Sequence, residues 1–222
     1  MTSIKEGTFY KCTSLAQITI PSSVKSIDKY SFYGCTSLTQ INIPSSATSI
    51  GEYSFYGCTS LTQIQLPPSI TSIGEYAFYE CKLYQIGIPH LVTEINKYTF
   101  ARCNYLNKVL IPPNLTKIGK MAFHVCKFDT TIIPYCVTTI EDDAFSRSWL
   151  EKIAIPSSVT SIGQGAFYQC FKLKLVTIFS SITVIRKDLF YDCYKLSQII
   201  IPSSVTTIEE GAFNECSSLT QI

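Results

Sequence analysis

Residues 150–172 read LEKIAIPSSVTSIGQGAFYQCFK, and the same spacing of residue types recurs along the whole chain. The consensus turn is L-x-x-I-x-I-P-x-x-V-x-x-I-G-x-x-A-F-x-x-C-x-x-L. Its phenylalanine returns at steps of 22 or 23 residues: Phe9, Phe32, Phe55, Phe78, Phe100, Phe123, Phe145, Phe167, Phe190 and Phe213. A fixed period of this length predicts a solenoid in which each turn buries its apolar side against the next turn.

Each turn divides into parts with different local preferences. The L-x-x-I-x-I segment, as in residues 38–43, alternates apolar and polar residues and predicts a half-buried strand that the following proline ends. The V-x-x-I segment, as in residues 159–162, predicts a second short strand. The A-F-x-x-C segment predicts a helical or 3₁₀ turn. Several turns place a glycine after the second strand, where φ > 0 is expected: Gly51, Gly74, Gly119 and Gly163.

The shorter turns share one cause. Each of the 22-residue turns lacks one residue between the Cys position and the following Leu position, at residues 81–83, 126–128 and 148–150. A deletion that recurs at the same place indicates an exposed loop that can shorten without disturbing the core.

Length and composition restrict the function classes. Of the 222 residues 46% are hydrophobic, which is enough for a continuous core and argues against disorder. The repeats extend along the whole chain and predict a single domain, residues 1–222, of about nine to ten repeats with no evident capping segments. The formal net charge of +2 gives no support to nucleic-acid binding. No apolar run reaches the roughly 18 residues of a membrane helix, and the first residues do not form a secretory signal, so we predict no membrane insertion.

No constellation for catalysis, a metal or a cofactor stands out. His90 and His124 are the only histidines, and their spacing suggests neither a nucleophile with an acid nor an H-E-x-x-H motif. The column of cysteines lacks the short C-x-x-C spacing of zinc sites, and its side chains are expected to point in parallel instead of converging for disulfides. We therefore expect buried, unpaired thiols beside the phenylalanines at nine positions: Cys12, Cys35, Cys58, Cys81, Cys103, Cys126, Cys170, Cys193 and Cys216. Cys136 stands outside this column and is the most accessible thiol expected.

A candidate binding surface lies on three consecutive turns. Apolar residues occupy a strand position that faces solvent and is usually polar elsewhere: Leu110, Ile132 and Ala154. Charged residues of the same turns flank them: Lys108, Asp129, Glu151 and Lys152. An apolar centre with a charged rim is typical of a recognition surface, and we predict that these seven residues bind a protein partner. Decay of the repeat with local repacking is the competing interpretation.

Further columns allow both a structural and a functional interpretation. Glutamine recurs at an outward strand position, where mutual amide hydrogen bonds along the stack are the preferred interpretation: Gln17, Gln40, Gln63 and Gln85. Tyrosines flank the Ala-Phe pair in two columns: Tyr30, Tyr53, Tyr76 and Tyr98, and Tyr10, Tyr33, Tyr56 and Tyr79. They are expected to stack with their hydroxyls in water, and a second interaction surface is the alternative.

The repeated I-P-x-x-V-x-x-I-G-x-x-A-F-x-x-C-x-x-L pattern resembles the BspA-like, or Treponema pallidum-type, class of leucine-rich repeats over essentially all 222 residues. The stretches IPSSVTSIG (155–163) and FYGCTSLTQI (32–41) are similar to the versions found in protists. The resemblance implies a right-handed, β-rich leucine-rich-repeat solenoid with a curved parallel sheet on its concave face. Short strands and helical or 3₁₀ turns would form the other side. The family is known for adhesion and host-interaction proteins, so the resemblance also implies protein recognition without catalysis.

Two functions agree with these observations. A non-enzymatic adhesion or host-interaction protein at the cell surface follows from the resemblance. The missing signal peptide and the unpaired cysteines favour instead an intracellular scaffold or regulator that docks a signalling enzyme such as a protein phosphatase. Both require a protein partner and no cofactor, metal or nucleic acid. The chain starts and stops within a repeat, and because an uncapped solenoid leaves an open sheet edge, a homodimer through one end is a further expectation.

Overall fold

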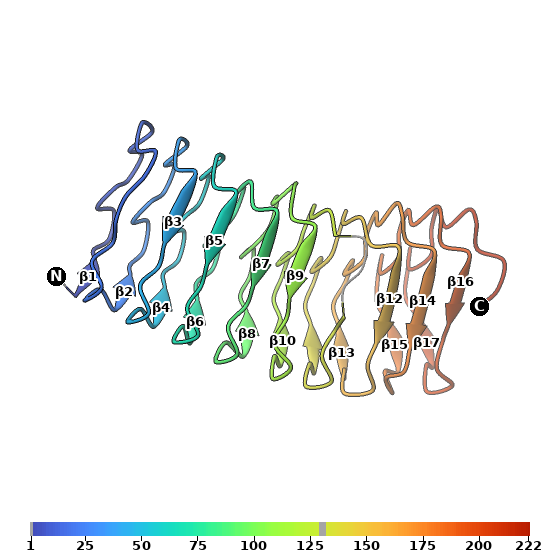
Figure 1. Ribbon diagram of the computed structural model, residues 1–222. Helices are drawn as coiled ribbons and strands as arrows, with labels where there is room; N and C mark the ends of the chain where they lie inside the picture. Colours follow the sequence, from blue (N-terminus) through green and yellow to red (C-terminus); the bar gives the residue numbers. More distant parts are fainter. Residues whose placement is uncertain (1, 129–131) are drawn as a thin grey trace.

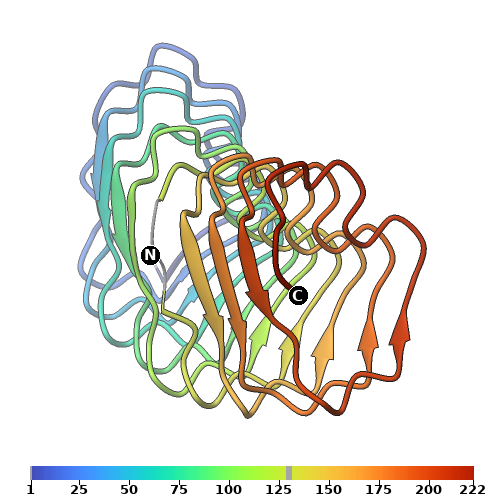
Figure 2. The same cartoon turned by 90° about the vertical axis from the view of Figure 1, so that its right-hand side faces the viewer.

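The computed structural model describes residues 2–128 and 132–222 and coils them into an elongated solenoid. Figure 1 shows the turns stacked along one axis, with the N-terminus and the C-terminus at opposite ends of the stack. In the view of Figure 2 the turns form open loops that are progressively displaced from one another, so the stack is curved. Each turn therefore packs mainly on the turn before it and the turn after it.

The L-x-x-I-x-I segments form a parallel sheet, here called the first sheet. Its strands pair in three groups: β3 (Gln40–Asn42) with β5 (Gln63–Gln65), β7 (Gln85–Gly87) with β9 (Lys108–Leu110), and β12 (Lys152–Ile155) with β14 (Leu175–Ile178) and then β16 (Gln198–Ile200). The register aligns equivalent repeat positions, for example Ile41 with Ile64 and Ile153 with Val176. In β3, β5 and β7 the central isoleucine is buried and both of its neighbours are exposed, as the alternation predicts.

The V-x-x-I segments form a second parallel sheet of two-residue strands on another side of the solenoid. One group contains β1 (Ser3–Ile4), β2 (Ser26–Ile27), β4 (Ser49–Ile50) and β6 (Ser72–Ile73). A second group contains β8 (Glu94–Ile95), β10 (Lys117–Ile118), β11 (Thr139–Ile140) and β13 (Ser161–Ile162), and a third pairs β15 (Val184–Ile185) with β17 (Thr207–Ile208). The predicted second strand is thus confirmed, and its isoleucine is buried in nearly every turn.

The prediction of a helical or 3₁₀ turn around the phenylalanines is wrong, because the described residues form consecutive hydrogen-bonded turns there and no helix. Backbone N–H donors alternate between two kinds of acceptor. Those of Ser31 and Tyr33 donate to carbonyls three residues earlier, at 3.3 and 3.1 Å, whereas those of Phe32 and Gly34 donate to the next turn, at 2.8 and 2.7 Å. A helix directs every N–H along its own axis, so sharing the donors with the next turn prevents a helix from forming.

The glycines after the second strand do not have the expected left-handed conformation, since φ is not positive at any of the four: Gly51, Gly74, Gly119 and Gly163. Close approach of the previous turn explains them instead. A Cβ atom added to Gly74 would lie 2.4 Å from the backbone nitrogen of Glu52. Left-handed φ values occur two residues before and two residues after each phenylalanine of the column, as at Tyr30 (+57°) and Gly34 (+67°) around Phe32.

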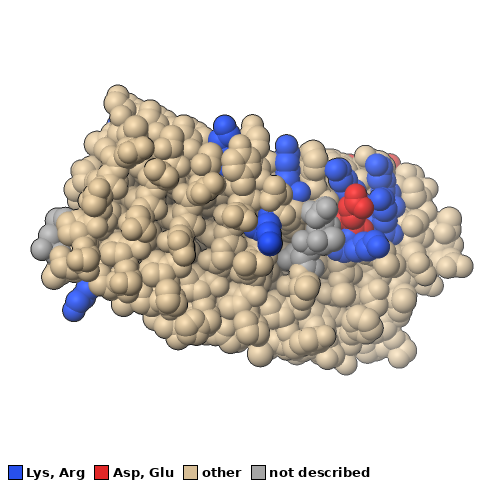
Figure 3. All heavy atoms as spheres, in the orientation of Figure 1, with Lys and Arg blue, Asp and Glu red and all other residues tan. Residues whose placement is uncertain are grey.

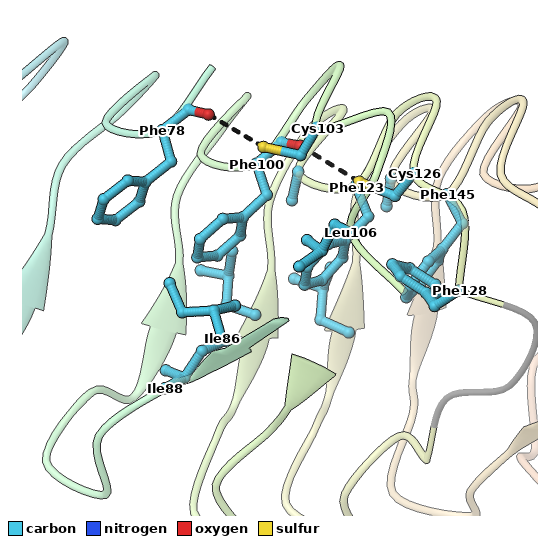
Figure 4. Close-up of a cluster of buried hydrophobic side chains, with 14 of the residues drawn as sticks. Phe78, Ile86, Ile88, Phe100, Cys103, Leu106, Phe123, Cys126, Phe128 and Phe145 are labelled. Carbon is cyan, nitrogen blue, oxygen red and sulfur yellow. Dashed lines mark hydrogen bonds between the residues drawn. The ribbon is translucent and has the colours of Figure 1, made fainter. Parts of the chain in front are cut away.

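The core is a continuous set of columns enclosed by the two sheets and the turns. The ten phenylalanine rings stack nearly parallel, with centroids of neighbouring rings 5.0–5.6 Å apart. Figure 4 shows the central part of this column, with Leu106 and Phe128 packed beside it at the Leu position of their turns. Because each ring covers its neighbours in sequence order, the column fixes how far apart successive turns lie.

The cysteine column runs beside the phenylalanines, and its members from Cys35 onward are buried as predicted. Each of these thiols donates a hydrogen bond to the backbone carbonyl of the column phenylalanine one turn earlier. Examples are Cys103 to Phe78 at 3.0 Å and Cys126 to Phe100 at 3.2 Å (Figure 4). Burial raises the pKa of the Cys103 thiol to about 12. All described cysteines are free thiols, and Cys136 is exposed as predicted. The prediction that Cys12 is buried is wrong: Cys12 is exposed, because it lies in the first described turn, which a neighbouring turn covers on one side only.

Candidate protein-binding face

Four of the predicted surface residues lie on the outer side of the first sheet. Lys108 and Leu110 are outward residues of β9, and Lys152 and Ala154 are outward residues of β12. All four are exposed. Ile132, one turn after Leu110, is 84% exposed, against 59% for Leu110. A single exposed apolar side chain is common on protein surfaces, so the feature of interest is that Leu110 and Ile132 are exposed on successive turns.

Of the two acidic residues predicted to flank the apolar centre, the described one, Glu151, forms an ion pair within the chain. The carboxylate of Glu151 lies 3.0 Å from Nζ of Lys174 in the next turn, and this exposed ion pair is worth at most about 1 kcal/mol. Asp129, the second acidic member of the prediction, lies outside the described residues. Lys108 and Lys152 therefore provide the accessible charge of the described part of this surface, and that charge is positive.

Exposed apolar residues continue beyond the predicted patch. Phe179 is 65% exposed and Ile200 52%. Ile200 belongs to the same outward column as Ala154, since Ala154 pairs with Thr177 and Thr177 with Ile200. Phe179 occupies the proline position of its turn, a substitution visible in the aligned repeats. The apolar character of this face was therefore underestimated from the sequence.

A hollow of about 900 Å³ lies over the N-terminal part of the first sheet, which agrees with a concave face there. Outward polar residues of β3, β5 and β7 line it, and Lys108 and Leu110 of β9 close one end. Gly87 contributes no side chain, and a Cβ atom at this position would meet nothing within 4 Å. The hollow and the predicted patch are thus neighbouring parts of one face and meet at β9.

The glutamine column does not form the expected amide ladder. Gln40 pairs with Gln63 through the backbone of β3 and β5, yet no side-chain hydrogen bond joins the glutamines that line the hollow within the described chain. Side-chain hydrogen bonds between turns are made elsewhere, for example by the Thr48 hydroxyl, which donates to the Lys25 carbonyl at 3.2 Å. The glutamine amides consequently keep their donors and acceptors for solvent or for a ligand.

A column of lysines and aromatic residues, which was not recognised from the sequence, runs beside the first sheet. We call it the lysine–aromatic ridge. Nζ of Lys127 lies 5.4 Å from the ring centre of Tyr105 and 4.7 Å from that of Trp149. Nζ of Lys172 lies 4.0 Å from the ring centre of Trp149, and Nζ of Lys82 lies 5.5 Å from that of Tyr105. The ridge occupies the position directly before the Leu position in six successive turns: Lys82, Tyr105, Lys127, Trp149, Lys172 and Lys195. The one-residue deletions fall in this loop, so the column becomes visible in the sequence only when positions are counted back from the Leu position of each turn.

The tyrosine columns stack as predicted. Ring centroids are 4.6 Å apart for Tyr53 and Tyr76 and 4.4 Å apart for Tyr76 and Tyr98. Burial, followed by the neighbouring Tyr98 hydroxyl, raises the pKa of Tyr76 to about 12. These rings are therefore part of the packing between turns, and their use as a second interaction surface stays a prediction.

One histidine has a serine partner, although their arrangement is structural. Nδ1 of His124 lies 2.7 Å from the Ser146 hydroxyl, which donates to the Asp143 carbonyl at 2.9 Å. Ser146 is only 1% exposed, so its oxygen is not open to a substrate. Burial, with Arg147 and Arg102 nearby, lowers the pKa of His124 to about 4. Within residues 2–128 and 132–222, no group of three His, Cys, Asp or Glu side chains is arranged to hold a metal ion.

The family model described as "BspA type Leucine rich repeat region" matches six copies, over residues 1–107, 25–149 and 138–222. The chain belongs to the BspA-type leucine-rich repeat family. Membership of this repeat family suggests that the chain takes part in protein–protein interaction. The exposed face of the first sheet agrees with such a role. Comparison with curated protein sequences gives no match. The described part of this leucine-rich repeat chain has no helix of the length and apolarity required to cross a membrane.

Solved structures of leucine-rich repeat proteins from three bacteria are similar to nearly the whole chain. A protein from Bacteroides ovatus is 29% identical with a TM-score of 0.67, covering 100% of this chain and 70% of its own. A leucine-rich cell surface protein from Faecalibacterium prausnitzii is 30% identical with a TM-score of 0.58, covering 98% and 75%. A protein from Eubacterium ventriosum shares the fold. It is 23% identical with a TM-score of 0.56, and the match covers 100% of this chain and 76% of that protein. These bacterial relatives give no support to the expected likeness to protist versions.

Proposed function

We propose that this leucine-rich repeat protein is a non-enzymatic protein-binding module that recognises its partner with the outer side of the first sheet. The observation that carries the proposal is the exposure of Leu110 and Ile132 at neighbouring turns, next to Lys108 and Lys152. Covering one such side chain completely is worth about 1.5–3 kcal/mol, so a partner that buries both gains a useful part of its binding free energy. Burial of exposed apolar residues within a polar rim is the arrangement found in the cores of protein interfaces.

For the biological setting we propose adhesion or host interaction at the cell surface. The similarity to the F. prausnitzii structure, described as a cell surface protein, supports this setting. An intracellular scaffold that docks a signalling enzyme such as a protein phosphatase is the second candidate, and the unpaired thiols favour it. Fractionation of the source cells separates the two: accumulation on the surface supports the first, and recovery only from the cytoplasm supports the second.

The proposed face can be tested by substitution and affinity capture. A double variant, Leu110→Ser with Ile132→Ser, is compared with the wild-type chain and with Leu91→Ser, which alters an exposed leucine (45%) outside the first sheet. We expect specific partners, identified by mass spectrometry, to be retained by wild type and by Leu91→Ser and to be lost, or weakened at least about 10-fold, with the double variant.

Both altered side chains are largely in water, so the double variant is expected to fold, which circular dichroism checks. Equal capture by the folded double variant and the wild type would remove this face from consideration. Turnover of a small molecule by the purified chain would contradict the non-enzymatic part of the proposal.

We further propose that two copies associate through an end of the solenoid. Strand β17 forms the edge of its group in the second sheet, and its Ile208 is 52% exposed although the equivalent residue of β15, Ile185, is fully buried. An open strand edge beside an exposed isoleucine favours pairing with another chain. Sedimentation velocity is expected to show a concentration-dependent dimer for the wild type and a monomer for Ile208→Glu. A wild-type chain that remains monomeric at all concentrations would contradict the proposal.

A further inference from the structure

Charge is distributed unequally between the two sides of the solenoid. The segments that run from each Cys position to the following Pro position contain seven lysines, and their acidic residues are Asp129 and Glu151. The lysines are Lys82, Lys108, Lys127, Lys152, Lys172, Lys174 and Lys195. The first three of these segments, residues 12–21, 35–44 and 58–67, contain no charged residue. Figure 3 shows one face of the molecule, on which basic side chains (Lys and Arg, blue) gather over the C-terminal half around few acidic atoms.

Most cations outside these segments, seven of eleven, form an ion pair with an acidic residue. Ion pairs join Lys29 to Glu52 at 2.8 Å and Lys117 to Glu141 at 2.6 Å. Within the lysine-rich group, by contrast, only Lys174 has an ion pair with an acidic residue of the described chain. The surface thus carries a positive charge that the described residues leave largely uncompensated, and such a surface favours an anionic partner.

The lysine–aromatic ridge holds part of this charge in a regular row. The ring of Trp149 contacts one lysine from the turn before it and one from the turn after it. Nζ of Lys127 lies 4.7 Å and Nζ of Lys172 lies 4.0 Å from the ring centre. These ring contacts attract the ammonium groups and limit the freedom of two long side chains. The two lysines lie two turns apart, which corresponds to about 10 Å for strands spaced by about 4.8 Å. Binding along the row therefore costs less side-chain entropy than binding to scattered lysines.

We propose that the lysine–aromatic ridge, together with Lys108 and Lys152 of the first sheet, binds an acidic polypeptide segment that also carries apolar side chains. This inference rests on the proposed function and adds the chemistry of the partner. An extended chain advances about 3.3 Å per residue, so carboxylates on every third residue match the spacing of about 10 Å along the ridge. Leu110 and Ile132 lie on the adjoining face, where a polypeptide supplies apolar side chains and a sulfated polysaccharide or a nucleic acid backbone does not.

The binding test uses a synthetic peptide of twelve residues that repeats Glu-Leu-Ser, carries a fluorophore and is titrated with the full chain. A peptide repeating Gln-Leu-Ser is the uncharged control, and heparin is the polysaccharide probe. Trp149 is the only tryptophan in the sequence, so its intrinsic fluorescence reports binding at the ridge. We expect the Glu peptide to bind at least about 10-fold more tightly than the Gln peptide, to change the Trp149 emission, and to weaken as salt is raised.

Charge variants locate the binding. Lys127→Gln with Lys172→Gln is expected to weaken the Glu peptide at least about 10-fold, as measured by anisotropy of the fluorophore. Lys5→Gln with Lys25→Gln removes the same charge from exposed positions outside the ridge and is expected to change the affinity less than about 2-fold. An equal loss in both variants would show that only net charge matters and would overturn the proposal. If the ridge variant fails to fold, the wild-type comparison of Glu and Gln peptides decides.

Other outcomes separate this inference from the proposed function. Equal affinity for the Glu and Gln peptides overturns the inference, and binding of heparin without binding of the Glu peptide assigns the ridge to an anionic polysaccharide instead. If captured partners depend on Leu110 and Ile132 but not on Lys127 and Lys172, the inference fails and the proposed function stands. If capture is unaffected by the Leu110 and Ile132 substitutions, the proposed function fails whatever the peptides show.

Discussion

At the scale of the single residue, His124 links protonation to folding. Its imidazole is half-buried and bonded to the Ser146 hydroxyl, and its pKa of about 4 lies below the value of about 6.5 expected in an unfolded chain. As the pH falls from 7 toward 4, the unfolded state takes up the proton first, so stability is lost over this window. The stabilising state of this residue is thus the neutral one.

We expect the His124→Gln variant to lose less stability than wild type between pH 7 and pH 4, by on the order of 1–2 kcal/mol. Glutamine retains a hydrogen-bonding group near Ser146 but does not titrate. The measurement is the free energy of unfolding from urea denaturation at several pH values, with His90→Gln at an exposed position as the control. Parallel pH profiles for wild type and His124→Gln would contradict the prediction.

The residues of the candidate site were predictable where they follow the strand period. Alternation placed Leu110 and Lys152 outward, and both are exposed. It could not show that Glu151 pairs with Lys174, because that ion pair joins side chains of two turns whose orientation depends on the stack. The contacts of Trp149 with lysines were missed for a related reason, since shortened loops obscure the alignment of neighbouring turns at this position.

At the scale of the element, the turns around the phenylalanines have an unusual backbone. Left-handed φ values recur two residues before and two residues after each ring, and most of these positions carry a residue other than glycine. The sequence of one turn suggested a helix because it offers helix-compatible residues in the A-F-x-x-C segment. Donation of alternate N–H groups to the next turn is a property of two adjacent turns, and sequence reasoning on a single turn could not anticipate it.

Val125 is expected to be strained, since its φ is +61° and β-branched residues rarely adopt that region. We predict that Val125→Gly stabilises the protein by about 0.5–1 kcal/mol, because the relief of strain exceeds the added entropy of the unfolded chain. Thermal and chemical denaturation measure the change. Thr13→Gly, at an exposed turn residue without positive φ, is the control and is expected to be destabilising. A loss of stability in Val125→Gly equal to that of the control would argue against the strain.

At the scale of the whole molecule, the period carries nearly all the information on the fold. Ten phenylalanines at nearly constant spacing predict stacked turns, and the structure aligns those rings in one column. Charge is organised on the same scale: the N-terminal part of the first sheet is neutral and lined by amides, whereas the C-terminal part is basic and partly apolar. This asymmetry exists only when the turns are compared with one another, and neither the net charge nor any single repeat reveals it.

The thiol hydrogen bonds have a consequence for the compartments in which the protein can fold. Each buried sulfur is held at a backbone oxygen of another turn with its proton in place, as at Cys170 beside the carbonyl of Phe145. Oxidants react with the deprotonated form, which burial disfavours strongly here. The core therefore depends on no covalent cross-link and exposes few sites to oxidation. Because the stack of turns needs no disulfide, it forms in a reducing compartment, where thiols stay unpaired.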